Sequence, residues 1–148
     1  MIPGYSIRRV EKQDYQGVCE ALNALTTVGE VSKAQFDATL DHWNHSLVLP
    51  DLLQYHPYVI LKDNQVAATG MLLIERKLIH GCGLVGHIED IAVSPQHQGK
   101  QLGRALIDHL TSLGLAHCYK VILDCDENNV KFYEKCGYSQ AGVEMQHR

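Results

Sequence analysis

The sequence lacks a long apolar run, a run of basic residues and any CxxC pair. No stretch reaches the ~18 consecutive apolar residues that a membrane-spanning helix needs. Residues 1–4 lead straight into a polar strand, so we expect neither a membrane span nor a signal peptide. Thirteen Lys and Arg against 17 Asp and Glu give a net charge of −4, which argues against nucleic acid or an anionic membrane as a partner.

The five cysteines form an odd set with neither zinc-site spacing nor the even count of a disulfide framework. We interpret them as reduced, mostly buried thiols of a cytoplasmic protein. The nine histidines show no metal-ligand spacing either, so we predict no metal site. The cysteines are Cys19, Cys82, Cys118, Cys125 and Cys136.

The length and hydrophobic periodicity predict one domain of mixed α/β type, of the α+β kind. Expected strands cover residues 5–10, 58–62, 65–69, 71–76, 87–93, 119–124 and 138–145, with Gly70 as a bulge between two of them. Expected helices cover residues 14–25, a stretch capped at Ser32 that carries Phe36, Leu40 and Trp43, and residues 102–113 and 128–135. Residues 45–56 and 80–86 are expected to be loops, and Gly137 is expected to cap the last helix.

The most informative segment is residues 86–113, where a strand carrying Glu89 and Asp90 is followed by a short polar loop and an amphipathic helix. The loop, residues 98–104, ends where the helix begins. Backbone N–H groups at a helix start have no intrahelical acceptor, and the macrodipole is positive there. The segment therefore predicts a phosphate-bearing ligand beside two carboxylates.

Two motifs carry a family resemblance. The loop over residues 98–104 resembles the pyrophosphate loop of the GNAT superfamily of acyl-CoA-dependent N-acyltransferases, with Gln101 where the first glycine is commonest. The segment from Asn129 through Phe132 and Tyr133 to Gly137 resembles the second hallmark of that superfamily. Residues 26–29, 74–77, 86–93 and 142–146 are similar to the eukaryotic branch that acetylates D-glucosamine 6-phosphate, and the resemblance covers residues 5–148.

The resemblance implies a twisted, mostly antiparallel sheet flanked by helices, with strands splayed where acetyl-CoA enters. It implies that the chain transfers acetyl from acetyl-CoA to the 2-amino group of D-glucosamine 6-phosphate, on the route to UDP-N-acetylglucosamine, in a ternary complex. The residues it assigns to acetyl-CoA are Ile91, Ala92, Val93, Gly99, Lys100, Gln101, Leu102, Gly103, Arg104, Asn129 and Tyr133.

Acetyl transfer to an amine requires a neutral amine, a polarised carbonyl and a stabilised thiolate. The resemblance makes Tyr133 the candidate acid for the sulfur; taken without the resemblance, it would be assigned to packing a helix onto the sheet. Asp124 is a candidate base or amine-orienting group, with a helix N-cap as the alternative. Glu89 and Asp90 point to opposite faces of a regular strand, so both meet the ligand only if a bulge intervenes. The resemblance implies that this strand carries such a bulge.

The substrate phosphate requires cations, and the resemblance assigns Lys77, His80 and Arg148 to it, with Thr26 as a hydroxyl contact. Each could equally be a solvated surface residue. The resemblance also implies a homodimer whose C-terminal strand crosses to the second subunit and completes the sites. The full set assigned to the sugar phosphate is Thr26, Lys77, His80, Glu89, Asp90, Asp124, Cys125 and Arg148.

Other interpretations of the sequence are weaker or remain open. Residues 81–86 match GxGxxG but precede a strand instead of opening a helix, and His87-Ile88-Glu89 lacks the PCxxC of zinc deaminases. Cys125 as an acetyl-enzyme nucleophile has no histidine at a recognisable spacing. A GNAT enzyme for another amine (a polyamine, an aminoglycoside or a protein lysine) is the nearest alternative, because a net charge of −4 suits a polycation. The second alternative is a non-catalytic module that binds acyl-CoA.

Overall fold

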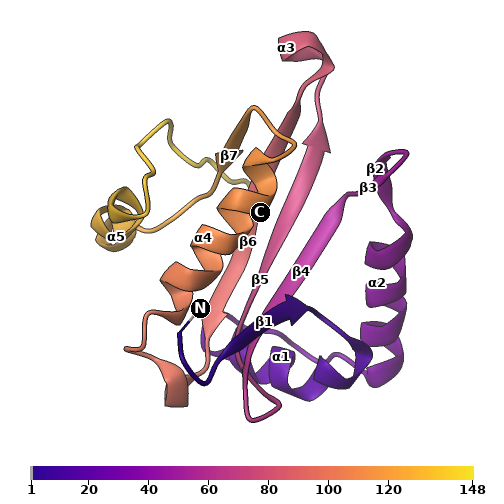
Figure 1. Ribbon diagram of the computed structural model, residues 1–148, viewed down its shortest axis with the longest axis vertical. Coiled ribbons are helices and arrows are strands. Elements are labelled where there is room, and N and C mark those ends of the chain that lie inside the picture. The colour runs from indigo at the N-terminus through magenta and orange to yellow at the C-terminus, as the bar shows by residue number, and fades with distance from the viewer. Residues whose placement is uncertain (1) are drawn as a thin grey trace.

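The computed structural model describes residues 2–148, and its centre is a five-stranded sheet (Figure 1). The strand order is β1-β4-β5-β6-β7. Four strands are antiparallel and the last, β7, lies parallel to β6. The predicted mixed, mostly antiparallel architecture is therefore confirmed. The strands are β1 (Ser6–Arg9), β4 (Tyr55–Lys62), β5 (Gln65–Arg76), β6 (Leu84–Val93) and β7 (Lys120–Ile122).

One face of the sheet is covered by α1 (Tyr15–Asn23) and α2 (Lys33–His45). The sequence predicts both helices, and Ser32 caps α2 in a reciprocal capping box with Gln35. The apolar sides of these helices meet alternate residues of β4. The cluster on this face contains Val10, Val18, Phe36, Leu40, Val59 and Leu61.

The opposite face is covered by α4 (Leu102–Leu115), whose predicted apolar stripe is confirmed. Leu102, Leu106 and Leu110 are almost completely buried, against Leu72 of β5 and Ile88 of β6. These three leucines, at about 1.5–3 kcal/mol for each fully buried Leu, hold the start of α4 firmly beside the end of β6. The phosphate-binding candidate loop is thereby placed next to the strand that carries Glu89.

The long β5–β6 hairpin extends beyond the other strands and ends in the short helix α3 (Ile79–Cys82), at the top of Figure 1. After α4 and β7 the chain forms η3 (Glu127–Asn129) and α5 (Val130–Lys135), as the pattern over residues 128–135 predicts. α5 lies beside α4 at the left of Figure 1.

Several expected elements are wrong. Residues 45–56 are not a loop: β2 (Leu47–Leu49) and β3 (Leu52–Leu53) form a small hairpin, and β4 begins at Tyr55 and includes Pro57. Residues 80–86 are not one loop either, because α3 and the start of β6 occupy them. β7 is a half-exposed edge strand of three residues rather than a buried strand over residues 119–124.

The last expected strand, over residues 138–145, is also wrong for the single chain, because residues 138–148 form neither helix nor strand. Alternating apolar residues make a strand only where a neighbouring backbone offers hydrogen bonds, and no strand within residues 2–148 pairs with this segment. The prediction of mostly buried cysteines is wrong as well. All five thiols are free, but only Cys118 is buried.

Candidate active site

The free edge of β6 is the first feature of the site. β7 pairs only with Val85, Gly86 and His87, at the start of β6. On that edge the remainder of β6, from Ile88 to Val93, has no strand partner among residues 2–148. Its backbone N–H and C=O groups are therefore available to an extended ligand lying between two diverging strands. The predicted splay is present, and Ile91, Ala92 and Val93 line it.

A β-bulge interrupts β6 in the middle of this edge. Thr69 pairs with Ala92 and Met71 pairs with Glu89, so Gly70 alone lies opposite Asp90 and Ile91. The extra residue is therefore in β6. The prediction of a bulge at Gly70 is wrong, because Gly70 lies in β5, on the strand opposite the bulge. Gly70 has a different reason: a Cβ there would collide with Ile91 Cδ1.

The bulge places Glu89 and Asp90 on the same face of the sheet. Ile88 packs with the α4 cluster, so Glu89 faces the α1/α2 side by alternation. Asp90 adopts φ 56° and borders a cavity lined by α1 and α2 side chains. Ile91 returns to the α4 side, near Leu106. The bulge therefore allows the carboxylates of Glu89 and Asp90 to face the same ligand.

Asp124 completes a cluster of carboxylates around Glu89. Desolvation raises the pKa of Glu89, and the negative charges of Asp90, Asp124 and Glu144 raise it further against the opposing effect of His87. Asp124 lies in the loop after β7 and does not cap the following helical turn, because Asp126 occupies that position. A carboxylate with a raised pKa is better matched to taking a proton from an ammonium group near neutral pH.

Glu144 and His87 also lie near Glu89, but the sequence analysis assigned neither of them a chemical role at this site. His87 Nε2 lies 2.9 Å from Glu75 Oε1 on the neighbouring strand, and this hydrogen bond lowers the pKa of Glu75. His87 lies opposite Leu73, so Glu75 is its diagonal neighbour on β5. The pair could have been predicted only from the register of the two strands. No periodicity indicates Glu144, because its segment has no regular structure.

The start of α4 forms the predicted anion-binding turn. The first helical hydrogen bond runs from the Ala105 N–H to the Gln101 carbonyl, so the three preceding N–H groups have no intrahelical acceptor. Gly99 and Gln101 both adopt positive φ, 79° and 62°, and Gly99 has nothing within 4 Å of a built Cβ. Lys100 and Arg104 are exposed beside them. Backbone donors, open space and two cations fit a pyrophosphate.

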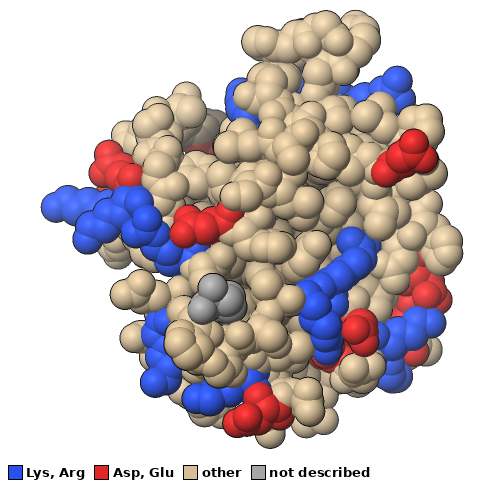
Figure 2. All heavy atoms as spheres, in the orientation of Figure 1, with Lys and Arg blue, Asp and Glu red and all other residues tan. Residues whose placement is uncertain are grey.

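Basic side chains also project at the left edge of the molecule in Figure 2, where α5 lies in Figure 1. Lys131 and Lys135 of α5 are both exposed. Asn129, the N-cap residue of α5, is exposed at the start of the same helix. Four basic side chains therefore lie on α5 and at the start of α4, where Asp108 and Glu134 accompany them, whereas the carboxylates around Glu89 lie at the β6 bulge.

Tyr133 is half-buried on α5 and is held there by the end of that helix. The N–H groups of Gly137 and Tyr138 donate to the carbonyls of Glu134 and Tyr133, both at 3.0 Å, with Gly137 at φ 93°. This is a complete Schellman motif, so the predicted glycine cap is confirmed. The Tyr138 hydroxyl is engaged by Thr111 of α4, which fixes α5 against α4.

Burial raises the pKa of Tyr133, and the neighbouring Cys125, Cys136 and Tyr138 raise it further. The phenol is therefore protonated throughout the neutral range and can act as a proton donor. Cys125, exposed in the loop after β7, is adjacent to this phenol. No cluster of His, Cys, Asp and Glu among residues 2–148 has the arrangement of a metal site.

The candidates for the substrate phosphate are not brought together within one chain. Lys77 lies near the end of the β5–β6 hairpin, with Nζ 3.5 Å from Glu75 Oε2. His80 is exposed in α3, where its ring stacks on Tyr119 at 4.2 Å between centroids. Thr26 is exposed after α1, and Arg148 Nε donates to Gln146 Oε1 at 3.4 Å.

Taken together, a strand pair splayed beside a bulge, a helix N-terminus open to phosphate and a half-buried phenol define an acyl-CoA-dependent N-acyltransferase. The family model described as "Acetyltransferase (GNAT) family" matches residues 17–138. The chain therefore belongs to the GNAT acetyltransferase family.

More specific relatives cover nearly the whole chain. "Glucosamine 6-phosphate N-acetyltransferase" of Candida albicans is 52% identical over 98% of this chain and 97% of its own length. "Glucosamine 6-phosphate N-acetyltransferase 1" of Dictyostelium discoideum is 41% identical over 96% of this chain and 89% of its own. The crystal structure of glucosamine-6-phosphate N-acetyltransferase from Arabidopsis thaliana superposes with a TM-score of 0.87 at 36% identity, and the match covers 97% of both chains.

Proposed function

We propose that this chain transfers an acetyl group from acetyl-CoA to the 2-amino group of D-glucosamine 6-phosphate, giving N-acetyl-D-glucosamine 6-phosphate. The relatives that are named for this reaction support it, at up to 52% identity over the chain. The observation that carries it is the β6 bulge, which presents two carboxylates to an amine beside a strand edge open to a thioester.

The acetyl donor is held by groups that this chain presents in order along β6 and α4. The N–H groups at the start of α4, with Lys100 and Arg104, bind the pyrophosphate, and the free edge of β6 from Ile91 to Val93 pairs with the extended arm. When bound, the donor supplies an activated acetyl group. Gly103 leaves room for close approach, because no atom lies nearer than 3.9 Å to a built Cβ.

Glu89 and Asp124 orient the amine and take its proton, because the raised pKa of Glu89 suits it to an ammonium group. Backbone N–H groups at the bulge polarise the thioester carbonyl. Tyr133 hydrogen-bonds to the departing sulfur and acts as its acid. Because the ordinary thiol pKa of ~8.5 lies below that of the phenol, this proton transfer is completed only as the amine proton, relayed through solvent, restores the phenol. Attack is direct, so Cys125 carries no acetyl group.

We further propose that the active form is a homodimer with sites at the interface. Residues 138–148 have no partner strand in the single chain, and Val143 and Met145 are each 87% exposed. Apolar side chains this exposed on an unpaired extended segment favour pairing with a second copy. A second copy would also bring cations near Thr26 that one chain leaves apart, so Lys77, His80 and Arg148 become the phosphate clamp.

The test measures free-thiol release from acetyl-CoA with D-glucosamine 6-phosphate and with unphosphorylated glucosamine. Fast release with the phosphorylated sugar alone is expected. Release with neither sugar, on protein shown by calorimetry to bind acetyl-CoA, would overturn the sugar assignment. A panel of polyamines, aminoglycosides and lysine peptides would then identify the acceptor, and saturable binding without turnover on any amine would indicate a binding module.

A further inference from the structure

Glu75 of β5 and His87 of β6 form a hydrogen-bonded pair that takes no part in the steps above. His87 Nε2 lies 2.9 Å from Glu75 Oε1. This hydrogen bond lowers the pKa of Glu75, so the carboxylate is ionised near neutral pH and only accepts. The hydrogen of the neutral ring is therefore on Nε2, and Nδ1 presents a lone pair. Within residues 2–148 the His87 side chain forms no other hydrogen bond.

His87 and Glu89 lie on the same face of β6, because they are two residues apart in a regular part of the strand. Their partners on β5, Leu73 and Met71, are likewise two residues apart. Cα atoms at this spacing are about 7 Å apart, a span that an imidazole and a glutamate side chain bridge directly or through one water. Desolvation raises the pKa of Glu89, and His87 opposes this rise. The two side chains are therefore neighbours on the side of Glu89 away from the bulge.

The inner side of the bulge offers no further acceptor for a proton. A cavity of about 230 Å³ lies there, between α1, α2 and the sheet. Among the described residues that line it, Asp90 is the only carboxylate and no histidine is present. Asp90 already belongs to the carboxylate cluster around Glu89. A proton held by Glu89 therefore has no exit through this cavity.

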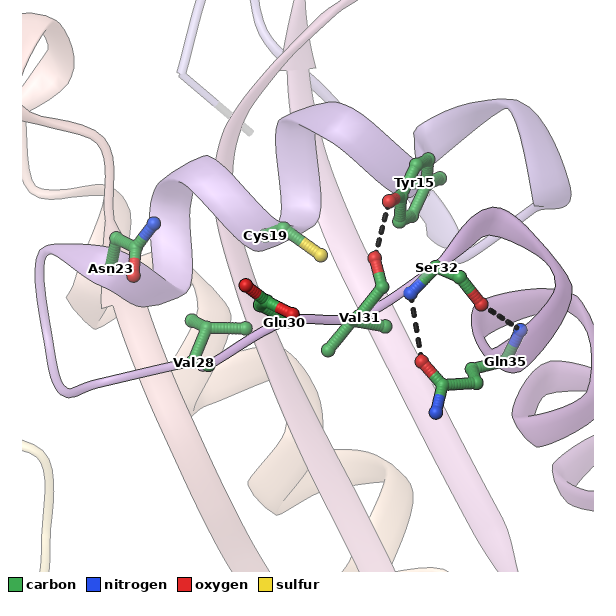
Figure 3. A pocket seen from close by; sticks show the side chains of 9 residues that line it. Tyr15, Cys19, Asn23, Val28, Glu30, Val31, Ser32 and Gln35 are labelled. Atoms are coloured by element: carbon green, nitrogen blue, oxygen red, sulfur yellow. Dashed lines mark hydrogen bonds between the residues drawn. The ribbon is translucent and has the colours of Figure 1, made fainter.

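The connection between α1 and α2 closes the same side from solvent. An outer hollow of about 640 Å³ lies between α1, the connection and the start of α2 (Figure 3). Its one charged lining residue is Glu30. Cys19, Val28 and Val31 line both the hollow and the inner cavity, so the connection is the wall between them. The Tyr15 hydroxyl holds this wall by donating to the Val31 carbonyl (Figure 3).

The open edge beside Glu89 is closed by the reactants themselves. Glu89 is exposed in the single chain. In the proposed function, however, the sugar lies against Glu89 and the thioester lies along the free edge of β6. The side chains of His87 and Glu75 are 25% and 45% exposed, on the far side of Glu89 from the bulge. The pair therefore connects a carboxylate that the reactants cover to solvent.

We propose that His87 Nδ1 takes the amine proton from Glu89 and delivers it to solvent, while Glu75 orients the ring and stabilises its positive charge. The proposal rests on the proposed function, because it assumes that the amine lies at Glu89. His87 and Glu75 act through Glu89 and are positioning residues. Imidazole is suited to the task, since histidine is the side chain that ordinarily changes its charge between pH 5 and 8.

The protons of this sequence balance. The ammonium group gives one proton to Glu89, whose carboxylate is restored when the proton passes to His87 Nδ1. The imidazolium then releases one ring proton to water and returns to the neutral ring. The amine nitrogen bonds to the acyl carbon, the carbon–sulfur bond breaks, and the second amine proton ends on the released thiol.

The charges that face His87 suit a transient imidazolium. Glu75 stands on β5 and Glu89 on β6, and the other carboxylates of the bulge surround Glu89. The cation on this side is Lys77, whose Nζ lies 3.5 Å from Glu75 Oε2. The positive charge that His87 acquires is therefore formed between two carboxylates, as the charge on a histidine oriented by a carboxylate is in hydrolases.

His87→Gln tests the relay, because the glutamine amide still donates to Glu75 but takes up no proton. It is expected to lower kcat for D-glucosamine 6-phosphate about 10²-fold, with acetyl-CoA affinity unchanged. Glu75→Gln keeps the acceptor oxygen and loses the charge, so about a tenfold loss is expected. His117→Gln is the matched control, since His117 is exposed after α4. Thiol release and calorimetry measure all three variants. An unchanged kcat in His87→Gln would overturn the proposal.

Rescue by free imidazole separates proton transfer from packing. His87→Ala leaves the space of the ring empty, and added imidazole is expected to raise its kcat about tenfold or more, in proportion to concentration. Pyrazole has the same shape but is a much weaker base, so it should give no rescue. Equal rescue by both, or by neither, would overturn the relay and assign His87 to packing.

The same measurements separate this proposal from the sugar assignment. Turnover of D-glucosamine 6-phosphate by the wild type, with equal turnover by His87→Gln, would overturn the relay and leave the sugar standing. Turnover of another amine alone would overturn the sugar. The His87 variants are then measured on that amine, where a loss in His87→Gln with imidazole rescue of His87→Ala would support the relay and an unchanged kcat would overturn it.

Discussion

Tyr133 and Tyr138 stand five residues apart on the same packed surface, yet their hydroxyls have different surroundings. Tyr138 is hydrogen-bonded to Thr111, whereas burial keeps Tyr133 protonated beside the exposed loop that carries Asp124 and Cys125. The Tyr138 hydroxyl therefore serves packing, and the Tyr133 hydroxyl is the one that we propose for catalysis.

Tyr133→Phe is expected to lower kcat by about 10²-fold, as loss of a general acid does, with little change in acetyl-CoA affinity. Tyr138→Phe is the control: it loses a hydrogen bond worth about 1 kcal/mol of stability and retains turnover. Steady-state rates, calorimetric affinity and thermal unfolding check both variants. Weakened acetyl-CoA binding in Tyr133→Phe, with kcat preserved, would reassign Tyr133 to packing.

Asp90→Asn is expected to lower the pKa of Glu89, because it removes a negative charge that raises that pKa. Asn tolerates the left-handed backbone at φ 56° as Asp does, so the bulge is preserved. A carbon-13 NMR titration of the Glu89 carboxyl measures the shift. The acid limb of kcat should move to lower pH with it, since a base with a lower pKa stays ionised at lower pH; an unmoved Glu89 titration would show that the two carboxylates are not coupled.

At the scale of the element, the turn before α4 explains why its family most often has glycine where this chain has Gln101. Gln101 adopts φ 62° and ψ 25°, a left-handed conformation that costs an L-residue about 1 kcal/mol or more. The cost is tolerated because the turn must aim three free N–H groups at one point. Gln101 therefore departs from the family pattern in residue type while keeping the backbone that the pattern requires.

Gln101→Gly is expected to stabilise the protein by about 0.5–1 kcal/mol and to raise Tm by roughly 2–4 °C, while acetyl-CoA still binds. Gly99→Ala is the opposite control, because Gly99 has φ 79° and open space around a built Cβ, so only backbone strain changes. It should lose about 1 kcal/mol. Calorimetric unfolding measures both. A loss of stability in Gln101→Gly would show that the Gln101 side chain contributes more than its backbone costs.

At the scale of the whole molecule, the C-terminal segment (residues 138–148) is the part that pairs with no strand of the same chain. Glu144 contributes to the charge around Glu89, but the segment that carries it has no strand partner. In the proposed homodimer, the segment that carries Glu144 would belong both to the active site and to the interface.

Deleting residues 139–148 is expected to convert a dimer into a monomer and to lower turnover of the sugar phosphate by about 10²-fold or more, as loss of positioning does. Acetyl-CoA affinity should stay within about threefold, because the start of α4 and the free edge of β6 remain. Sedimentation velocity and calorimetry measure the two effects. Leu115→Ser, at another exposed apolar residue, is the control; a truncated chain that remains dimeric would place the interface elsewhere.

The sequence alone predicted the features that arise from local physics. Helix periodicity located α1 and α4, the capping pair Ser32 and Gln35 located the start of α2, and Gly137 located the end of α5. The anion-binding turn was also predictable, because helix ends are set by neighbouring residues in the chain. Residue roles at the site remain predictions, supported by family motifs and by the geometry around the bulge.

The tertiary structure decided what depends on partners distant in sequence. It showed that the extra residue opposite Gly70 lies in β6, where the resemblance implied a bulge, and not in β5, since a register is a property of two strands and not of one glycine. It joined residues 47–53 into a hairpin, left residues 138–148 unpaired, and brought Asp124 and Glu144 to Glu89. Periodicity determined which residues are apolar together, but only the packed sheet determined which carboxylates repel one another, because charges interact through space and not along the chain.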